Sequence, residues 1–436
     1  MSSSPQVLTQ RPSRAHFLKV IVLLFLLLAA AEFVIRGPLR YLENPSEWND
    51  LSQNYTASKL WLRGESPANP KNFLALWKEQ TLIGLDANDI RTHLAPPLGG
   101  LVVLAPVAAF PWKAAKLLWL VILLFCFAVT VGVFLRVLGH PWNSFQCSTF
   151  LATCLALAPF HTGIANGNTS ILVIAFCAAA IWSATNRHDI SAGILFGCAC
   201  SIKPQLGAFL VLYYLVRQRW RIFGVAVGCT AALNLVAVLY LYIRGASWIR
   251  DYVNNARGFV ASNNIDSFAS DNPGRFSLIN LQVPFFSITR NSNSANLWAF
   301  GITVALICGW MFIVFKRKEE NELLTLAAIS VIALLPVYHR AYDAAVLVVP
   351  LCWCITEAAG AYKRLARSGL FLIVPFLFPG SAYLQGLALH GRVAPSLKDS
   401  AVWNSVIMPH ESWVLLLLCI VLLSAIFLSQ SSDVKS

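Results

Sequence analysis

Apolar runs of roughly 15 to 25 residues recur along most of the chain, with short polar or basic stretches between them. A run of about 20 apolar residues is long enough to cross the roughly 30 Å hydrocarbon core of a bilayer as a helix. Charged residues make up 12% of the chain, against about 25% in an ordinary soluble domain. The pattern therefore predicts an all-α, polytopic membrane protein that forms one domain over residues 1–436.

The net charge of +13 comes from Lys and Arg residues that gather in short clusters between the apolar runs. Clusters of this kind are typical of the cytoplasmic ends of spans, so they indicate a membrane protein and no nucleic-acid partner. Basic residues also precede the first apolar run, and no clean small-residue cleavage site follows it. We therefore expect a retained first span at about 17–36, a cytoplasmic N-terminus, and a multi-pass protein of a bacterial plasma membrane.

Three polar stretches are too long to be simple turns between spans: 37–97, 244–294 and 387–411. The positions of the basic clusters predict that all three lie on the outer side of the membrane. The segment from Glu43 to Pro97 holds seven of the chain's 20 acidic residues, so a catalytic carboxylate is first sought there. Two pieces of it, 50–62 and 71–80, mix apolar and polar residues as interfacial helices do.

Two topologies give twelve spans with both chain ends inside, and they differ only between residues 98 and 216. In one, 98–110 is re-entrant and 190–216 breaks into two short spans at Lys203-Pro204. In the other, 98–110 is a span and 190–216 is a single helix. The first is preferred because proline breaks a helix and an intramembrane lysine is costly unless it faces a polar interior. Gly193 and Gly197 are spaced for close contact between helices.

Polar side chains concentrate at the outer ends of the spans in the preferred topology. A carboxylate there can take a proton from a hydroxyl, and cations and amides can hold a phosphate as it leaves. This combination suits transfer of a sugar from a lipid phosphate in the plane of the membrane. The candidate site residues are Asp50, Arg91, His93, Asn166, Asn168, Lys203, Arg275, His339, Arg340 and Asp343.

Several of these residues also have a purely structural interpretation. Asp50 is a candidate helix cap, and Lys203 is a candidate for snorkelling to an interface. His339-Arg340 is a candidate anchor pair, and Asp343, four residues beyond His339, is placed to neutralise it. Asn168-Thr169-Ser170 fits the glycosylation sequon, which is too common by chance to carry weight.

No cofactor or metal is expected from the sequence. Most of the eleven cysteines lie within apolar runs, where they are expected to be small buried hydrophobic residues, and none has metal-ligand spacing. No phosphate-binding glycine motif of a nucleotide enzyme is present. Besides a membrane glycosyltransferase, the pattern leaves open a lipid or glycan transporter without chemistry, and a lipid-linked glycan ligase or polymerase.

The order and spacing of several short motifs over about 45–355 resemble glycosyltransferase family 87. The motifs are Asp50 with Tyr55–Leu60 and Gly64–Pro67, Pro96-Pro97-Leu98 leading to Ala105-Pro106, Asn166-Gly167-Asn168, Ala192-Gly193-Ile194 through Lys203-Pro204-Gln205, Ser277–Gln282, and Pro336–His339.

The resemblance implies a GT-C-like bundle of about twelve transmembrane helices with short interfacial helices in its outer loops. It implies a metal-independent, inverting transfer of a hexose, in particular mannose, from a polyprenyl-phosphate donor to a glycolipid or glycan acceptor at the outer face. Asp50 would be the general base, and His339 would lie beside the donor phosphate. A tyrosine precedes His339 where the family more often has tryptophan. Lys203 as a phosphate contact follows from the preferred topology and not from the resemblance.

Overall fold

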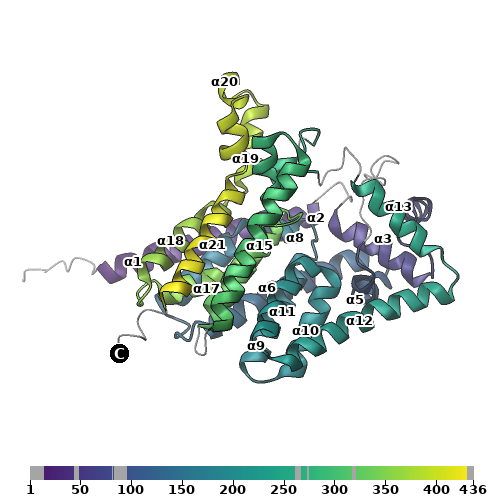
Figure 1. Ribbon diagram of the computed structural model, residues 1–436, viewed down its shortest axis with the longest axis horizontal. Helices are drawn as coiled ribbons and strands as arrows, with labels where there is room; N and C mark the ends of the chain where they lie inside the picture. Colours follow the sequence, from purple (N-terminus) through teal and green to yellow (C-terminus); the bar gives the residue numbers. More distant parts are fainter. Residues whose placement is uncertain are drawn as a thin grey trace, which may run out of the picture.

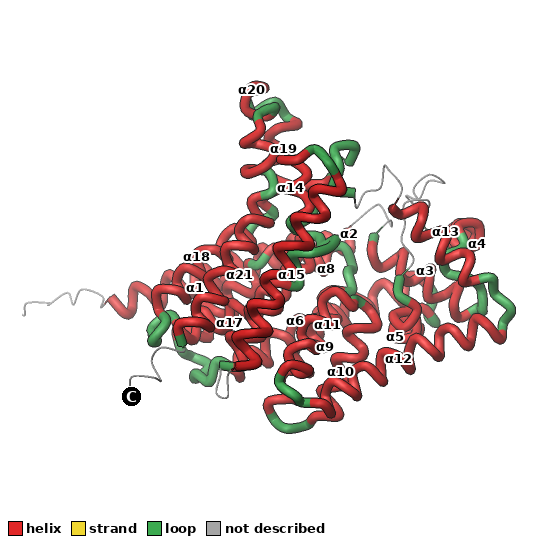
Figure 2. The backbone as a smooth tube through the Cα atoms, viewed as in Figure 1, coloured by secondary structure: helices red, strands yellow, loops and turns green. Residues whose placement is uncertain are grey.

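The computed structural model describes residues 14–43, 49–80, 82, 96–260, 267–272, 274–316 and 321–429. This part of the chain is all-α, as predicted, and it contains no strand beyond an isolated antiparallel bridge between Leu278 and Arg340. Figure 2 shows helices throughout, joined by short loops.

The first half of the fold runs from the N-terminal helix to the long helix α12. Its elements are α1 (Arg14–Val34), the π-helix η1 (Ile35–Leu39), α2 (Arg40–Glu43), α3 (Asp50–Leu62), α4 (Pro70–Glu79), α5 (Leu98–Ala108), α6 (Trp112–Val137), α7 (Phe145–Ala156), α8 (Ala158–Ala165), α9 (Ser170–Thr185), α10 (Asp189–Ile202), α11 (Pro204–Val216) and α12 (Trp220–Ile243). The two helix-like pieces predicted in the first loop correspond to α3 and α4.

The second half contains the other two long loops and the C-terminal helices. Its elements are α13 (Trp248–Val260), the 3-10 turn η3 (Arg275–Ser277), α14 (Gln282–Thr289), α15 (Ser292–Lys316), α16 (Glu322–Ile332), the 3-10 helix η4 (Ala341–Leu347), α17 (Val348–Glu357), α18 (Lys363–Ile373), η5 (Val374–Leu377), α19 (Gly380–Leu389), α20 (Pro395–Lys398), the π-helix η6 (Trp403–Ile407) and α21 (His410–Leu428).

Among the described residues, five helices are long and apolar enough to cross a membrane, and two bent helix pairs raise the number to seven. The apolar helices identify a multi-pass membrane protein. The predicted count of twelve spans is not confirmed, because α5, α9, α10, α11 and α16 have only 11 to 16 residues each. A helix of 11 to 16 residues rises about 16 to 24 Å, which is less than the hydrocarbon core.

The segment 190–216 breaks at Lys203, as the preferred topology predicts. Lys203 ends α10 in a non-helical conformation, and Pro204 begins α11. Proline is well suited to this first helical position, where its missing N–H costs no hydrogen bond. The break leaves the Lys203 side chain between two short helices, where it meets polar partners instead of lipid.

Small residues let α10 pack closely against α12, also as predicted. A Cβ on Gly193 would lie 2.5 Å from the Val225 side chain, and one on Gly197 would lie 2.5 Å from Cys229. These distances are shorter than real Cβ contacts, so glycine is required at both positions for the helices to approach.

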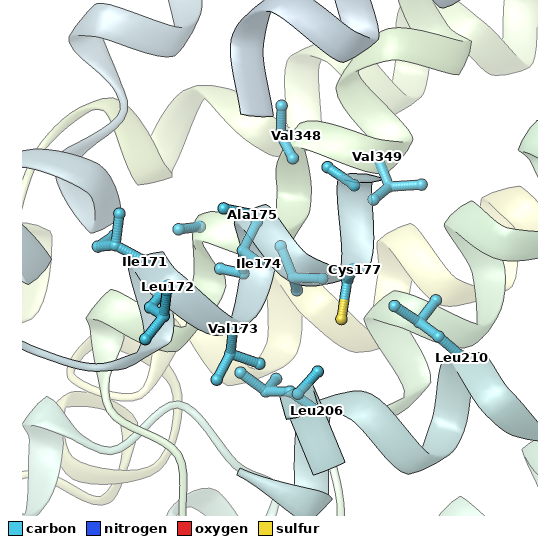
Figure 3. Packing of buried hydrophobic residues seen from close by; sticks show 14 of the residues in the cluster. Ile171, Leu172, Val173, Ile174, Ala175, Cys177, Leu206, Leu210, Val348 and Val349 are labelled. Carbon is cyan, nitrogen blue, oxygen red and sulfur yellow. The ribbon is translucent and has the colours of Figure 1, made fainter. Parts of the chain in front are cut away.

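The buried core surrounds α9, which is apolar on all sides. Figure 3 shows its residues Ile171–Ala175 and Cys177 packed with side chains of α11 and α17. The polar turn that precedes α9 is therefore attached to a closely packed helix. In Figure 1, α3 and α13 lie beside one end of α12, whereas α19 and α20 project from another part of the bundle.

Candidate active site

Asp50 is the first residue of α3, and its backbone is fixed on both sides. The cap of α3 is Asn49, whose side chain accepts from Ser52 N at 3.0 Å while Ser52 Oγ accepts from Asn49 N at 3.1 Å. Asp50 N donates to Asn166 O at 3.2 Å. Since Asn49 caps the helix, the Asp50 carboxylate is available for a different contact, and it accepts from Asn168.

The turn Asn166-Gly167-Asn168 joins α8 to α9 and packs directly against the start of α3. Gly167 has a φ of +64°, a left-handed conformation that favours glycine. A Cβ there would also lie 2.8 Å from Leu51 Cβ. The Trp119 indole donates to Gly167 O at 2.9 Å, and Asn168 N donates to Gly163 O at 2.8 Å. The turn is therefore held rigidly beside the first residue of α3.

The Asn168 side chain links Asp50 to the bundle interior. Asn168 is buried, and its Nδ2 donates to Asp50 Oδ2 at 2.7 Å. Its Oδ1 accepts from Ser170 N at 2.7 Å and from Lys203 Nζ at 3.1 Å, and it lies 2.6 Å from Ser170 Oγ. Residues 118 positions apart in sequence thus share a hydrogen bond.

Lys203 and Asp343 form a buried ion pair at the centre of this cluster. Lys203 Nζ lies 2.8 Å from Asp343 Oδ1, and the two side chains are 14% and 0% exposed. Lys203 Nζ also donates to Ser170 Oγ at 2.6 Å and lies 5.0 Å from the centre of the Tyr342 ring. Together with the bond to Asn168, these contacts use all three donors of the ammonium group.

Asp343 also holds His339 and the backbone around it. Asp343 Oδ2 lies 3.0 Å from His339 Nδ1 and accepts from Arg340 N at 3.3 Å, and Ser170 Oγ donates to Asp343 Oδ1. Burial raises the pKa of the Asp343 carboxyl, but the Lys203 ammonium and the His339 hydrogen bond outweigh burial and hold the pKa well below its usual range. Asp343 is therefore a buried carboxylate that orders four neighbouring groups: the side chains of Lys203, Ser170 and His339 and the backbone N–H of Arg340.

His339 Nε2 is buried and has no hydrogen-bond partner among the described residues. A buried polar atom without a partner costs free energy, so this nitrogen is a strong candidate for contact with a bound molecule. The neighbouring Arg340 is half-buried, and its Nε donates to Tyr338 Oη at 2.9 Å.

Residues 278–281 of the second long loop pair with the segment that carries His339. Ile279 N donates to His339 O at 2.9 Å, and Leu278 pairs with Arg340. Arg275 begins this stretch; it is buried, and its guanidinium lies 4.5 Å from the centre of the Phe276 ring. Burial and the nearby Arg290 lower its pKa. One guanidinium nitrogen of Arg275 has no hydrogen-bond partner within the described chain.

The structure brings five of the predicted site residues into one connected cluster: Asp50, Asn168, Lys203, His339 and Asp343. Arg340 joins it through its backbone N–H, which donates to Asp343. Arg275 is not part of the cluster; it lies three residues before Leu278, which pairs with Arg340. The Asn166 side chain bonds to Thr162 O of its own helix at 3.0 Å, and only its carbonyl reaches Asp50. Arg91 and His93 lie outside the described residues.

Sequence reasoning missed Ser170, which contacts Lys203, Asp343 and Asn168. It also missed Trp119, which holds the turn before α9. The only sequence signal for Ser170 is its place in Asn168-Thr169-Ser170, a motif too common by chance to single it out. Trp119 sits within an apolar run and carries no sequence signal for this contact.

The cluster has a carboxylate at one edge and a histidine at the other, with a buried ion pair between them. A carboxylate in this setting can accept a proton, and the neighbouring cations can stabilise negative charge. No group of three His, Cys, Asp or Glu side chains is arranged to hold a metal ion in the described part of the chain.

Comparison with protein-family models matches residues 96–350 to Glycosyltransferase family 87. The matched segment covers more than half of the 436 residues and includes Asn168, Lys203, Arg275, His339 and Asp343, whereas Asp50 precedes it. Comparisons with curated proteins and with solved structures returned no match. By the matched segment and the all-helical membrane fold, the chain belongs to glycosyltransferase family 87, a family of GT-C-type glycosyltransferases.

Proposed function

We propose that this glycosyltransferase moves a hexose, mannose in the first instance, from a polyprenyl-phosphate donor to a hydroxyl of a glycolipid or glycan acceptor. The observation that carries the proposal is the contact between Asp50 and Asn168, which sets a carboxylate beside a cluster of cationic side chains. A sugar transferase that uses a lipid phosphate needs both a base for the acceptor and cations for the leaving group.

Asp50 is the general base in this proposal. Its carboxylate takes the proton from the acceptor hydroxyl as the acceptor oxygen forms its bond to the anomeric carbon. The bond from that carbon to the phosphate oxygen breaks, and its electron pair leaves with the phosphate. Attack opposite the leaving group inverts the anomeric centre. The Asp50 proton is then lost to solvent, which restores the carboxylate.

The side chains that receive the phosphate are Arg275, His339 and Arg340. Arg275 and His339 each carry a buried nitrogen with no partner among the described residues, and anion binding would satisfy both. Lys203 has a different role, because its three N–H donors already bind Asn168, Ser170 and Asp343. Lys203 therefore orders the cluster instead of binding the donor.

The site faces the outer side of the cell membrane in this proposal, and the fold is a single GT-C-like bundle of about twelve membrane helices. Support comes from the basic residues at the turn 217–221, which joins α11 to α12 at the ends remote from Lys203. In this topology the short helices α10 and α11 would cross the membrane in combination with their neighbours, and α5 would be re-entrant.

The test is transfer by purified protein in detergent with radiolabelled polyprenyl-phosphate sugars. Mannose, glucose and arabinose donors are compared with a lipid extract as acceptor. The proposal predicts labelled product from the mannose donor and release of polyprenyl phosphate in equal amount. Movement of lipid-linked sugar across liposomes without any sugar transfer would instead indicate a transporter, and would contradict the proposal.

A further inference from the structure

We propose that Asn168 is a positioning residue, which holds the Asp50 carboxylate in the orientation for proton abstraction and connects it to the Lys203–Asp343 ion pair. This inference rests on the proposed function of Asp50. It differs from the sequence-based expectation, in which Asn168 binds the donor.

The orientation of the Asn168 amide is determined by its surroundings. Its Oδ1 lies between the ammonium of Lys203 at 3.1 Å and the backbone N–H of Ser170 at 2.7 Å. Both are donors only, so an amide rotated by 180° would turn its own NH₂ towards them. The oxygen therefore has to face Lys203 and Ser170, and the NH₂ group has to face Asp50 Oδ2 at 2.7 Å.

The backbone of Asn168 is as closely held as its side chain. Gly167 takes its left-handed conformation against Leu51, and Asp50 N donates to Asn166 O at 3.2 Å. The turn before α9 and the first residue of α3 are thus joined by a backbone bond and a side-chain bond. A rotation of the Asp50 carboxylate away from its place would break the side-chain bond, and Asn168 has no freedom to follow it.

Asn168 also connects the two ends of the cluster. The hydrogen bonds run from Asp50 to Asn168, then to Lys203, Asp343 and His339. The charged and titratable groups around the junction are Lys203, Asp343, His339, Tyr342 and Arg340. A hydrogen bond to an ionised carboxylate favours the charged form, so Asn168 keeps Asp50 ionised and ready to accept a proton.

The experiment measures kcat, the donor KM and the pH dependence of kcat/KM for Asn168→Ala and Asn168→Asp. Loss of a hydrogen bond to a charged group predicts a fall in kcat of about 10- to 100-fold for Asn168→Ala. The acid limb of the profile should move about one pH unit upward, because the carboxylate loses a donor. Asn168→Asp should move it further in the same direction, because a second carboxylate then faces Asp50. The donor KM should stay within about twofold of the wild type.

The matched control is Asn186→Ala, at the end of α9 remote from Asn168. Asn186 is exposed, and its Nδ2 donates to Trp182 O at 2.8 Å. This variant should have the wild-type kcat and an unmoved acid limb. Ser170→Ala, which removes a hydroxyl beside Asn168 Oδ1, should move the limb upward by a smaller amount. It also provides a readout if Asn168→Ala does not elute as a folded monodisperse protein.

Four outcomes would overturn the inference. An unmoved acid limb in both Asn168 variants would show that Asn168 does not act on the base. A raised donor KM with an unchanged acid limb would assign Asn168 to donor binding. Full activity of Asp50→Asn, measured in parallel, would refute the proposed base itself and with it this inference. An inactive Asp50→Asn beside wild-type behaviour of the Asn168 variants would refute only the inference.

Discussion

Replacing Lys203 by methionine tests whether the cluster depends on its buried ion pair. Methionine has a chain of similar length without a charge, so the substitution removes the ammonium group and little else. It leaves the fully buried Asp343 carboxylate without the partner that lies 2.8 Å from it. His339 and Ser170 remain on the carboxylate, so its hydrogen bonds are reduced but not abolished.

The expected cost follows from the burial of the two groups. Breaking a buried pair by removal of one partner typically costs about 3 to 5 kcal/mol, because the other charge is left uncompensated. Lys203 retains 14% exposure, so water weakens the pair and the lower end of that range, about 3 kcal/mol, is the prediction. Combining Lys203→Met with Asp343→Asn removes both charges. The double variant should therefore be more stable than the sum of the single effects implies, by roughly 0.5 to 3 kcal/mol.

The assay is the free energy of unfolding in mixed micelles, followed by SDS titration. The control is Arg63→Met, which removes a different ion pair of the same chain: two Arg63 nitrogens lie 2.6 and 2.8 Å from the Glu79 oxygens. Both of those side chains are exposed, so the control should leave the stability unchanged within error. Equal stability of Lys203→Met and Arg63→Met would refute the account of a buried, uncompensated carboxylate.

Three further predictions follow from the same geometry. Gly167→Ala should destabilise the protein by more than Gly139→Ala. Both glycines have left-handed backbones, but of the two only a Cβ on Gly167 would meet a neighbour, Leu51 Cβ at 2.8 Å. Thermal unfolding midpoints of the two variants check this. The stability difference between wild type and Asp343→Asn should narrow as the pH falls below about 4. A carboxyl whose folded pKa is lowered stabilises the protein above its unfolded pKa and loses that contribution as it is protonated; unfolding titrations at several pH values measure the difference. Arg275→Met removes a buried cation proposed to bind phosphate, so it should lower kcat/KM for the donor by about 10-fold or more, chiefly through a higher donor KM. Arg290 is exposed, and Arg290→Met should leave both kinetic constants unchanged.

Much of the fold could be predicted from the sequence, because hydrophobic run length and proline position act locally. The all-α membrane class and the break at Lys203-Pro204 are local in this sense, and the glycine contacts of α10 follow from a spacing that the sequence shows directly. The number of spans could not be predicted in the same way. Helices of 11 to 16 residues are shorter than the hydrocarbon core, and the sequence does not reveal how they combine with their neighbours.

The site was predictable in part for a similar reason. Charged and titratable residues in apolar surroundings are conspicuous, so Lys203, His339 and Asp343 were all identified. The contact between His339 and Asp343 was also expected from their spacing of four residues. The pairing of Lys203 with Asp343 was not predicted, since the two are 140 residues apart, and neither was the contact that Asn168 makes with Lys203. Ser170 illustrates the limit: a buried serine has no distinguishing sequence pattern, and only the fold reveals that it touches both members of the ion pair.

The most direct measurement of the central claim is sugar transfer by Asp50→Asn, with purified protein and labelled polyprenyl-phosphate mannose. Glu79→Gln is the control, because it also removes an acid of the first long loop but an exposed one that pairs with Arg63. The account predicts that Asp50→Asn folds, binds donor, and transfers at least about 100-fold more slowly than wild type, while Glu79→Gln transfers at the wild-type rate. A folded Asp50→Asn protein that transfers at the wild-type rate would contradict it.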